Sequence, residues 1–268
     1  ELSRWSPLRH LAWHSLPALA LIEPAAADAA RAGRHGVALE RFGLWSDGPP
    51  APAPDVAHAD TEILERACER ALARAGGGAS RAAVFVDRDG TLVVERGRPA
   101  EPEDLELLPG IPEAIRLLRA AGHPVVVISN QSWIGRGLAT PARVHFGMAR
   151  LRVLLRAHGV ELDAIHFCPH RPDEGCDCRK PGTALLRRAA DDLQLALARS
   201  AMVGDKRLDV ATGQAAGGAG VLVRTGYGRE EEARIGGPDF PRPPERVCDD
   251  LGAAAAWFLA REEGRTAV

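Results

Sequence analysis

From residue 81 onward, short apolar runs alternate with stretches of helical periodicity, and this alternation constrains the fold more than any other feature. The predicted strands are the apolar runs 82–86, 124–129, 164–167, 201–203 and 220–224. The predicted helices are 111–121, 141–158, which has Thr140 as its N-cap and stops at Gly159, and 183–198. The run PVVVIS has no polar alternation, as expected for a strand buried on both faces. The pattern predicts an α/β fold with a doubly wound, Rossmann-like parallel sheet.

Composition divides the chain of 268 residues into a main domain and flanking segments. Residues 1–48 hold three of the five tryptophans and no catalytic motif, and their role is left open. Residues 49–80 combine a stiff PPAPAP spacer with an amphipathic helix predicted at 60–75, and are interpreted as a linker and adaptor helix. The α/β domain is predicted at 81–262, with a tail at 263–268. A fused binding or scaffold module is an open alternative for residues 1–80.

The overall composition excludes several classes of protein. Hydrophobic residues make up 46% of the chain and charged residues 26%, which excludes a disordered chain. The net charge is −2, so no basic field is available to attract nucleic acid or an anionic membrane. No run of 18 apolar residues is present, and no membrane partner is expected. Only two residues, Lys180 and Lys206, are lysines among 34 basic residues, and both lie in the motifs described next.

Two carboxylates, Asp87 and Asp89, follow the first predicted strand in the stretch FVDRDGTL. Gly90 comes next and lets the backbone turn sharply, so both carboxylates can enter one crevice. Two anions this close repel each other, and a divalent cation or a shared proton relieves that repulsion. Oxygen ligands favour Mg²⁺, beside which one carboxylate can accept a phosphoryl group while the other acts as general acid and base. A surface Asp-x-Asp turn is the alternative interpretation of this motif alone.

The other predicted strand ends carry groups that suit a phosphate. Ser129 and Asn130 offer a hydroxyl and an amide, which bind phosphate oxygens without adding charge. Lys180, in the stretch CRKPG, offers an ammonium that neutralises phosphate charge. Asp205 follows the strand at 201–203 as a candidate metal ligand, and Asp209 can support it from the next helical turn.

Taken in order, these motifs resemble those of the haloacid dehalogenase (HAD) superfamily of aspartyl-phosphate hydrolases. The matching segments are Asp87-Arg88-Asp89-Gly90-Thr91, Ser129, Lys180, and Gly204-Asp205 with Asp209. The resemblance implies that Asp87 attacks phosphorus, and that Asp89 protonates the leaving oxygen and then activates water. It implies that Ser129 and Lys180 bind the transferring phosphoryl group. The implied Mg²⁺ ligands are Asp87, the backbone carbonyl of Asp89, and Asp205, with Asp209 in support.

A second group of metal-binding residues precedes Lys180. Cys168, His170, Cys176 and Cys178 have the spacing C-x-H-x5-C-x-C, and three thiolates with one imidazole match a tetrahedral structural Zn²⁺ site. Disulfide pairing or three unrelated buried thiols is the alternative interpretation. Reduced thiolates predict a cytoplasmic setting.

A zinc-binding loop just before Lys180 is similar to that of the phosphatases that remove the 7-phosphate from D-glycero-D-manno-heptose 1,7-bisphosphate. The similarity covers about residues 81–259 and includes the stretches SNQSWIGRG, CDCRKP and MVGDKRLD. It implies substrate-binding roles for Asn130, Arg136, Arg179 and Lys206. The related histidinol-phosphate phosphatases provide the alternative function.

Two departures from this family leave the substrate and its anomer open. Trp133 stands where the family usually has Gly, and residues 95–99 differ from the usual loop after the first motif. Both loops lie where the leaving group is selected. Because only 42 positions separate Asp87 from Ser129, there is space for no more than a minimal cap. An open site for a small phosphorylated molecule is therefore expected, and the sequence makes no prediction of oligomeric state.

Overall fold

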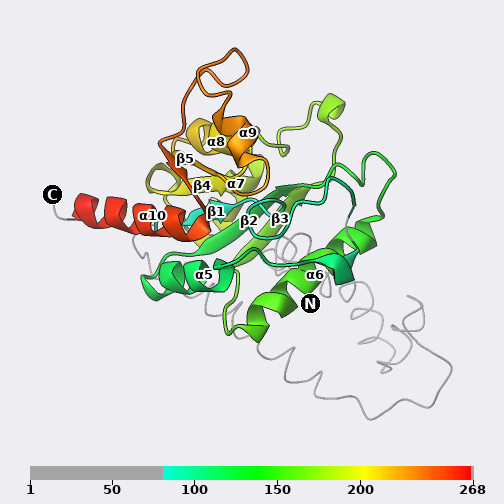
Figure 1. Cartoon of the computed structure of the whole chain (residues 1–268), viewed down its shortest axis with the longest axis horizontal. Helices are drawn as coiled ribbons and strands as arrows, with labels where there is room; N and C mark the ends of the chain where they lie inside the picture. The colour runs from blue at the N-terminus through cyan, green and yellow to red at the C-terminus, as the bar shows by residue number, and fades with distance from the viewer. Residues whose placement is uncertain (1–80, 100, 267–268) are drawn as a thin grey trace, which may run out of the picture. The chain divides into compact units, whose positions relative to one another are not determined.

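The computed structural model describes residues 81–99 and 101–266 (Figure 1). The predictions for residues 1–48 and 49–80 lie outside this described part. Six parallel strands form one sheet in the order β3-β2-β1-β4-β5-β6. They are β1 (Val84–Val86), β2 (Val125–Asn130), β3 (Ala164–Cys168), β4 (Ala201–Gly204), β5 (Ala219–Val223) and β6 (Arg246–Cys248). This is a doubly wound order, so the predicted fold class is confirmed; only β6 lacks a counterpart among the predicted strands.

Helices cover both faces of the sheet (Figure 1). They are α5 (Ile111–Ala120), α6 (Pro141–Ala157), α7 (Ala184–Leu193), α8 (Arg207–Ala215), α9 (Gly228–Glu232) and α10 (Leu251–Thr266), with short 3-10 turns η2 (Pro102–Asp104), η3 (Pro172–Glu174) and η4 (Leu197–Arg199). Helix α10 continues across the predicted domain boundary at 262. Within the described residues, none of these helices has the length and hydrophobicity needed to cross a bilayer.

Alternate residues of the central strands pack into two separate cores. Val84 and Val127 join the core formed with α5, α6 and α10, while Phe85, Val126 and Ile128 join the core formed with α7. Both faces of β2 are thus buried, as its unbroken apolar sequence predicts. Between β1 and β2 the described chain forms a loop, η2 and α5 and adds no further domain, which agrees with a minimal cap.

The ends of the helices follow local sequence signals, with one exception. Thr140 caps α6 by accepting a hydrogen bond from the backbone N–H of Arg143, and Gly159 follows the helix at a φ of 70°. The prediction of one helix over 183–198 is wrong after residue 193, because α7 ends at Leu193 and Gln194 adopts a φ of 53°. The backbone of Arg81 pairs there with residues 194 and 196, which turns the chain toward β4.

Candidate active site

The carboxyl ends of β1, β2 and β4 meet at one edge of the sheet, where a cavity of about 410 Å³ lies. This edge is where open parallel sheets bind their ligands. The four residues predicted to take part in catalysis all line the cavity: Asp87 after β1, Asp89 two residues later, Ser129 in β2, and Lys180 from the segment between β3 and α7. Topology thus brings together residues that are far apart in the sequence.

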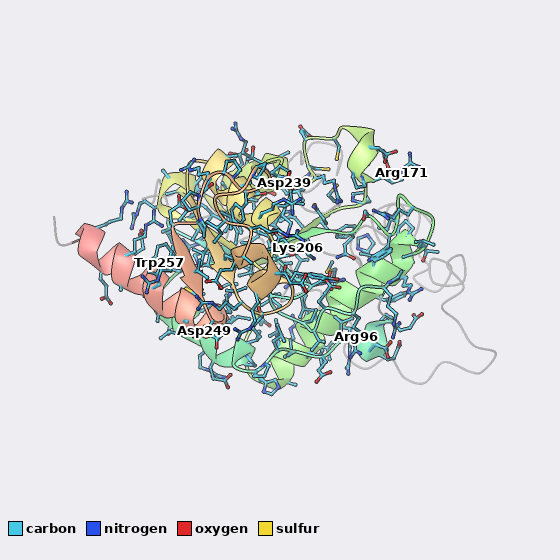
Figure 2. The ribbon with its side chains drawn as sticks, turned by 45° about the horizontal axis from the view of Figure 1, so that its top comes forward. Arg96, Arg171, Lys206, Asp239, Asp249 and Trp257 are labelled. Carbon is cyan, nitrogen blue, oxygen red and sulfur yellow. The ribbon has the colours of Figure 1, made fainter. Side chains whose placement is uncertain are left out.

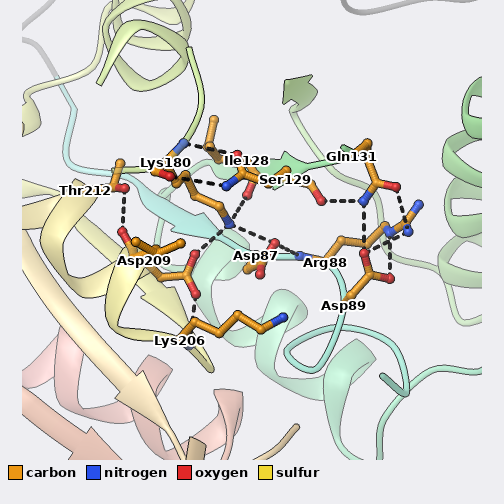
Figure 3. A network of polar contacts seen from close by, with 12 residues as sticks. Asp87, Arg88, Asp89, Ile128, Ser129, Gln131, Lys180, Lys206, Asp209 and Thr212 are labelled. Carbon is orange, nitrogen blue, oxygen red and sulfur yellow. Dashed lines mark hydrogen bonds and ion pairs between the residues drawn. The ribbon is translucent and has the colours of Figure 1, made fainter. Parts of the chain in front are cut away.

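The side chain of Lys180 connects two carboxylates within this site. Its Nζ lies 2.9 Å from Asp87 Oδ1 and 2.6 Å from Asp209 Oδ1, and it donates to the carbonyl of Ile128 at 2.9 Å (Figure 3). Burial alone would lower the pKa of Lys180, but the charges of Asp209 and Asp87 outweigh it and raise that pKa. The ammonium is therefore held in its charged form beside Asp87.

Three buried carboxylates, those of Asp87, Asp205 and Asp209, gather next to the cavity, and one oxygen of each lies within 4.8 Å of the others. Burial and the charges of Asp87 and Asp209 raise the pKa of Asp205 to about 8. Burial also raises the pKa of Asp209 to about 6, although Lys180 opposes that shift. Asp205 Oδ1 is buried and has no hydrogen-bond partner among the described residues. A divalent cation relieves both the repulsion and the unpaired oxygen, so these residues fit Mg²⁺.

Two glycines make space for the Asp205 side chain. Gly90 has a φ of 80° and Gly226 a φ of 54°, and a Cβ at either position would collide with Asp205 Oδ2. That oxygen accepts a hydrogen bond from the backbone N–H of Tyr227 at 2.9 Å. The carboxylate of Asp205 is thus fixed by backbone on one side while its Oδ1 remains available.

The carboxylate of Asp89 is held by different partners. It accepts two hydrogen bonds from the guanidinium of Arg88, at 3.0 and 2.8 Å, and one from Gln131 Nε2 at 2.9 Å (Figure 3). Gln131 Nε2 also donates to Ser129 Oγ at 2.8 Å. Burial alone would raise the pKa of Asp89, but the charge of Arg88 and these hydrogen bonds lower it. Gln131 therefore joins the predicted acid–base residue to the predicted phosphate-binding hydroxyl.

Asn130 lines the cavity and also holds the backbone of Lys180. Its Oδ1 accepts from the backbone N–H of Lys180 at 3.0 Å, and its Nδ2 donates to the carbonyl of the same residue at 3.3 Å. The amide that is predicted to bind substrate thus also fixes the backbone of Lys180, whose ammonium is predicted to bind the transferring phosphoryl group.

Two of the residues predicted to bind substrate, Arg179 and Lys206, also line the cavity. Lys206 Nζ lies 3.2 Å from Glu95 Oε2 and 4.7 Å from the centroid of the Tyr227 ring. Burial alone would lower the pKa of Lys206, but the charges of Asp205, Asp87 and Glu95 raise it. The guanidinium of Arg179 donates to the carbonyl of His170 at 3.4 Å. Both cations are thus held in place by neighbouring groups.

Arg136 is the one residue predicted to bind substrate that does not line the cavity. It is exposed, and its guanidinium carbon lies 5.9 Å from the centroid of the Trp133 ring. Trp133 does line the cavity, so the contact of Arg136 with the site runs through the Trp133 ring.

The four predicted zinc ligands come together from the two sides of η3, which follows Arg171 in a segment that projects from the rest of the domain (Figure 2). The sulfur atoms of Cys168, Cys176 and Cys178 are 3.3–3.6 Å apart, and His170 Nδ1 lies 3.5 Å from Cys168 Sγ and 3.2 Å from Cys178 Sγ. A tetrahedral zinc site has edges of about 3.8 Å between sulfurs and about 3.6 Å from nitrogen to sulfur. Burial and the adjacent thiols raise the pKa of Cys178. A cation would reverse that effect, so the cluster fits Zn²⁺.

Comparison with known proteins identifies the family. A curated protein of Thermosynechococcus vestitus named D-glycero-D-manno-heptose-1,7-bisphosphate 7-phosphatase is 41% identical over 189 residues, which cover 66% of this chain and 95% of that relative. The chain belongs to this family of HAD-like phosphatases. A family model described as HAD-hydrolase-like matches residues 177–254 of this phosphatase.

A second curated relative and a solved structure agree with this assignment. The D-glycero-beta-D-manno-heptose-1,7-bisphosphate 7-phosphatase of Escherichia coli K12 is 41% identical over 152 residues, which cover 54% of this phosphatase and 80% of the relative. The D,D-heptose 1,7-bisphosphate phosphatase of B. bronchiseptica, crystallised with magnesium and phosphate, is 36% identical with a TM-score of 0.61. That match covers 67% of this phosphatase and 98% of the crystallised chain.

Sequence reasoning missed several residues of the phosphatase site. Gln131 has a signal that could have found it: it lies two residues after Ser129 at the end of a strand, where side chains two apart share a face. Arg88 has no such signal, because strand alternation points it away from its neighbours Asp87 and Asp89. Only the turn after β1 brings its guanidinium back to Asp89.

Proposed function

We propose that this phosphatase hydrolyses the 7-phosphate of D-glycero-D-manno-heptose 1,7-bisphosphate through an aspartyl-phosphate on Asp87. One observation carries the proposal: besides Lys180, which lies beside Asp87, the cavity is lined by further cations, among them Arg179 and Lys206. A substrate with two phosphates engages more of these cations than a monophosphate does, and the names of the relatives point to the same substrate.

The first half of the reaction transfers the phosphoryl group to Asp87. Its Oδ1 accepts hydrogen bonds from Lys180 Nζ at 2.9 Å and from the backbone N–H of Arg88 at 2.7 Å, which leaves Oδ2 to attack phosphorus. A bond forms from Oδ2 to phosphorus as the bond to the sugar oxygen breaks. Asp89 gives that oxygen a proton, and Ser129 and Lys180 bind the transferring group.

The second half of the reaction releases phosphate. Asp89, now ionised, takes a proton from water while the water oxygen bonds to phosphorus and the bond to Asp87 breaks. The lowered pKa of Asp89 in the free protein keeps this carboxyl ionised, which is the form that can accept a proton. An arriving phosphate dianion favours the protonated form of the same carboxylate, which supplies the acid for the first half.

Two metal ions complete the proposal. The residues that would hold Mg²⁺ are Asp87, Asp205 and the backbone carbonyl of Asp89, with Asp209 in support. When bound, the ion neutralises the charge of the phosphoryl group. The cluster of Cys168, His170, Cys176 and Cys178 would hold a structural Zn²⁺ that fixes the segment before Lys180.

The remaining predictions about cellular context are proposals of the same kind. Reduced zinc thiolates favour a cytoplasmic setting. The small cavity and minimal cap favour a free phosphorylated metabolite as the substrate. We assign the catalytic domain to residues 81–266, because α10 extends that far, and residues 49–80 to a linker and adaptor helix; the role of residues 1–48 is left open.

The experiment measures phosphate release with Mg²⁺ from both anomers of the heptose bisphosphate and from histidinol phosphate. We expect a strong preference for the heptose substrate and loss of activity in Asp87→Asn. Asp239→Asn, the same change at an exposed position, is the matched control and should retain full activity. Preference for histidinol phosphate would overturn the proposed substrate, and full activity in Asp87→Asn would overturn the mechanism.

A further inference from the structure

Trp133 is an unusual residue in the wall of this cavity. Most residues of the wall are polar or charged, and its other aromatic residue, Tyr227, has the ammonium of Lys206 over its ring. Trp133 is half-buried and, among the described residues, does not belong to any of the hydrophobic cores, although the adjacent Ile134 packs against one. The indole therefore offers the cavity a large apolar surface that the fold itself does not use.

The backbone that carries Trp133 is firmly anchored. The Trp133 carbonyl accepts hydrogen bonds from the backbone N–H groups of Leu138 and Ala139 at 2.9 and 3.1 Å. Gly135 donates to the carbonyl of Pro169 at 2.9 Å, and a Cβ on Gly135 would lie only 2.9 Å from that same oxygen. The loop is thus tied to the segment that carries the Cys/His cluster.

The Trp133 ring also contacts a residue outside the cavity. The guanidinium carbon of Arg136 lies 5.9 Å from the ring centroid, within the range of a cation–π contact, and Arg136 does not line the cavity. One part of the indole is therefore covered by Arg136, and the part that lines the cavity is left for a ligand. A surface held in place before binding contributes more to affinity than one that must be ordered.

We infer that Trp133 is a specificity-determining residue that packs against the carbon skeleton of the sugar leaving group, and that Arg136 positions its ring. A sugar ring presents C–H groups on its faces, which suit an indole, while its hydroxyls suit the charged remainder of the wall. This inference rests on the proposed function, because it takes the leaving group to be a phosphorylated sugar.

The test compares Trp133→Ala and Trp133→Phe on two substrates, the heptose bisphosphate and acetyl phosphate, whose leaving group has no sugar ring. Trp133→Ala should raise KM for the heptose substrate about tenfold with little change in kcat, because the contact is made equally in the ground and transition states. Both variants should hydrolyse acetyl phosphate like the wild type, and Trp133→Phe should keep most of the heptose activity. Arg136→Met should raise the same KM less, and should add nothing to Trp133→Ala.

Two outcomes would overturn this inference. An unchanged KM for the heptose substrate in Trp133→Ala would show that the indole does not contact it. An equal loss of activity on the heptose substrate and on acetyl phosphate in Trp133→Ala would show that the indole has a structural role. Trp133→Phe would then lose less activity on both substrates. Failure of the proposed function is distinguishable, because wild type would then hydrolyse acetyl phosphate and leave the heptose bisphosphate intact.

Discussion

Magnesium binding should depend steeply on pH, because Asp205 must lose a proton before it can coordinate the ion. Asp205 is fully buried, its Oδ1 has no hydrogen-bond partner among the described residues, and Asp87 and Asp209 lie beside it. Burial and those two charges raise its pKa to about 8. Proton and metal compete for one carboxylate, so the affinity for Mg²⁺ should rise with pH and level off above pH 8.

The size of the effect follows from that pKa. The ionised fraction of Asp205 is about one in two at pH 8, one in 11 at pH 7 and one in 101 at pH 6. The apparent Kd for Mg²⁺ should therefore be about a hundredfold weaker at pH 6 than at pH 9. At pH 7, about 0.9 protons should be released for each ion bound.

Isothermal titration calorimetry of the full chain with MgCl₂ measures both quantities. Titrations from pH 6 to 9 give the affinity, and repeats in two buffers of different ionisation enthalpy give the number of protons released. Asp205→Asn should bind Mg²⁺ weakly and without this slope, whereas the control Asp239→Asn should behave like the wild type. A constant affinity across this range with no proton release would refute the assignment of Asp205 as the protonated ligand.

Three further changes test other parts of the site. Lys180→Met should lower the free energy of unfolding of the metal-free protein by about 3–5 kcal/mol, measured by urea denaturation, because it leaves Asp87 and Asp209 buried without a counter-charge; an unchanged value contradicts this. Gly90→Ala should weaken Mg²⁺ binding at least tenfold in calorimetry, since its Cβ collides with Asp205 and its φ is unfavourable; wild-type binding would rule out this steric argument. Removing zinc with a chelator should lower Tm and raise KM for the heptose substrate, and added Zn²⁺ should reverse both changes. Finding no zinc in the purified protein would contradict this prediction.

The metal-free protein should also become less stable as pH rises. The folded-state pKa of Asp205 is above its unfolded value of 3.8, so the folded state binds this proton more tightly. The stability that the proton provides is complete below about pH 4 and is lost as pH rises toward 8. Saturating Mg²⁺ should remove most of this loss in thermal denaturation, and the same pH slope with and without Mg²⁺ would contradict the linkage.

The central part of the site could be predicted from the sequence because its chemistry sits in short motifs at strand ends. Asp87 and Ser129 directly end apolar runs, and a parallel sheet places such ends together whatever the details of the loops. The clustering of Cys168, His170, Cys176 and Cys178 could be predicted for a similar reason, since all four lie within 11 positions of the sequence. These predictions therefore depended only on the order of the strands in the sheet and not on the conformation of the loops.

The contacts that could not be predicted depend on the conformation of turns and loops, which decides which side chains meet. Arg88 reaches Asp89 only because of the turn at Gly90, and Lys206 meets Glu95 across the cavity from a different loop. The end of α7 was missed because Gln194 is not a typical helix terminator, and the turn there is imposed by pairing with Arg81. Strand β6 was missed because Arg246–Cys248 is short and only its last residue is buried.

The position of the Cys/His cluster explains how one loop can influence both ends of the cavity. Cys168 is the last residue of β3, and its carbonyl accepts the backbone N–H of Gln131 at 2.7 Å, where the loop with Trp133 begins. Ten residues later Cys178 leads directly into Arg179 and Lys180, which line the cavity. A metal held by the cluster would therefore fix both the start of the loop that carries Trp133 and the position of Lys180. Because both depend on one set of ligands, loss of the metal should affect substrate selection and phosphoryl transfer together.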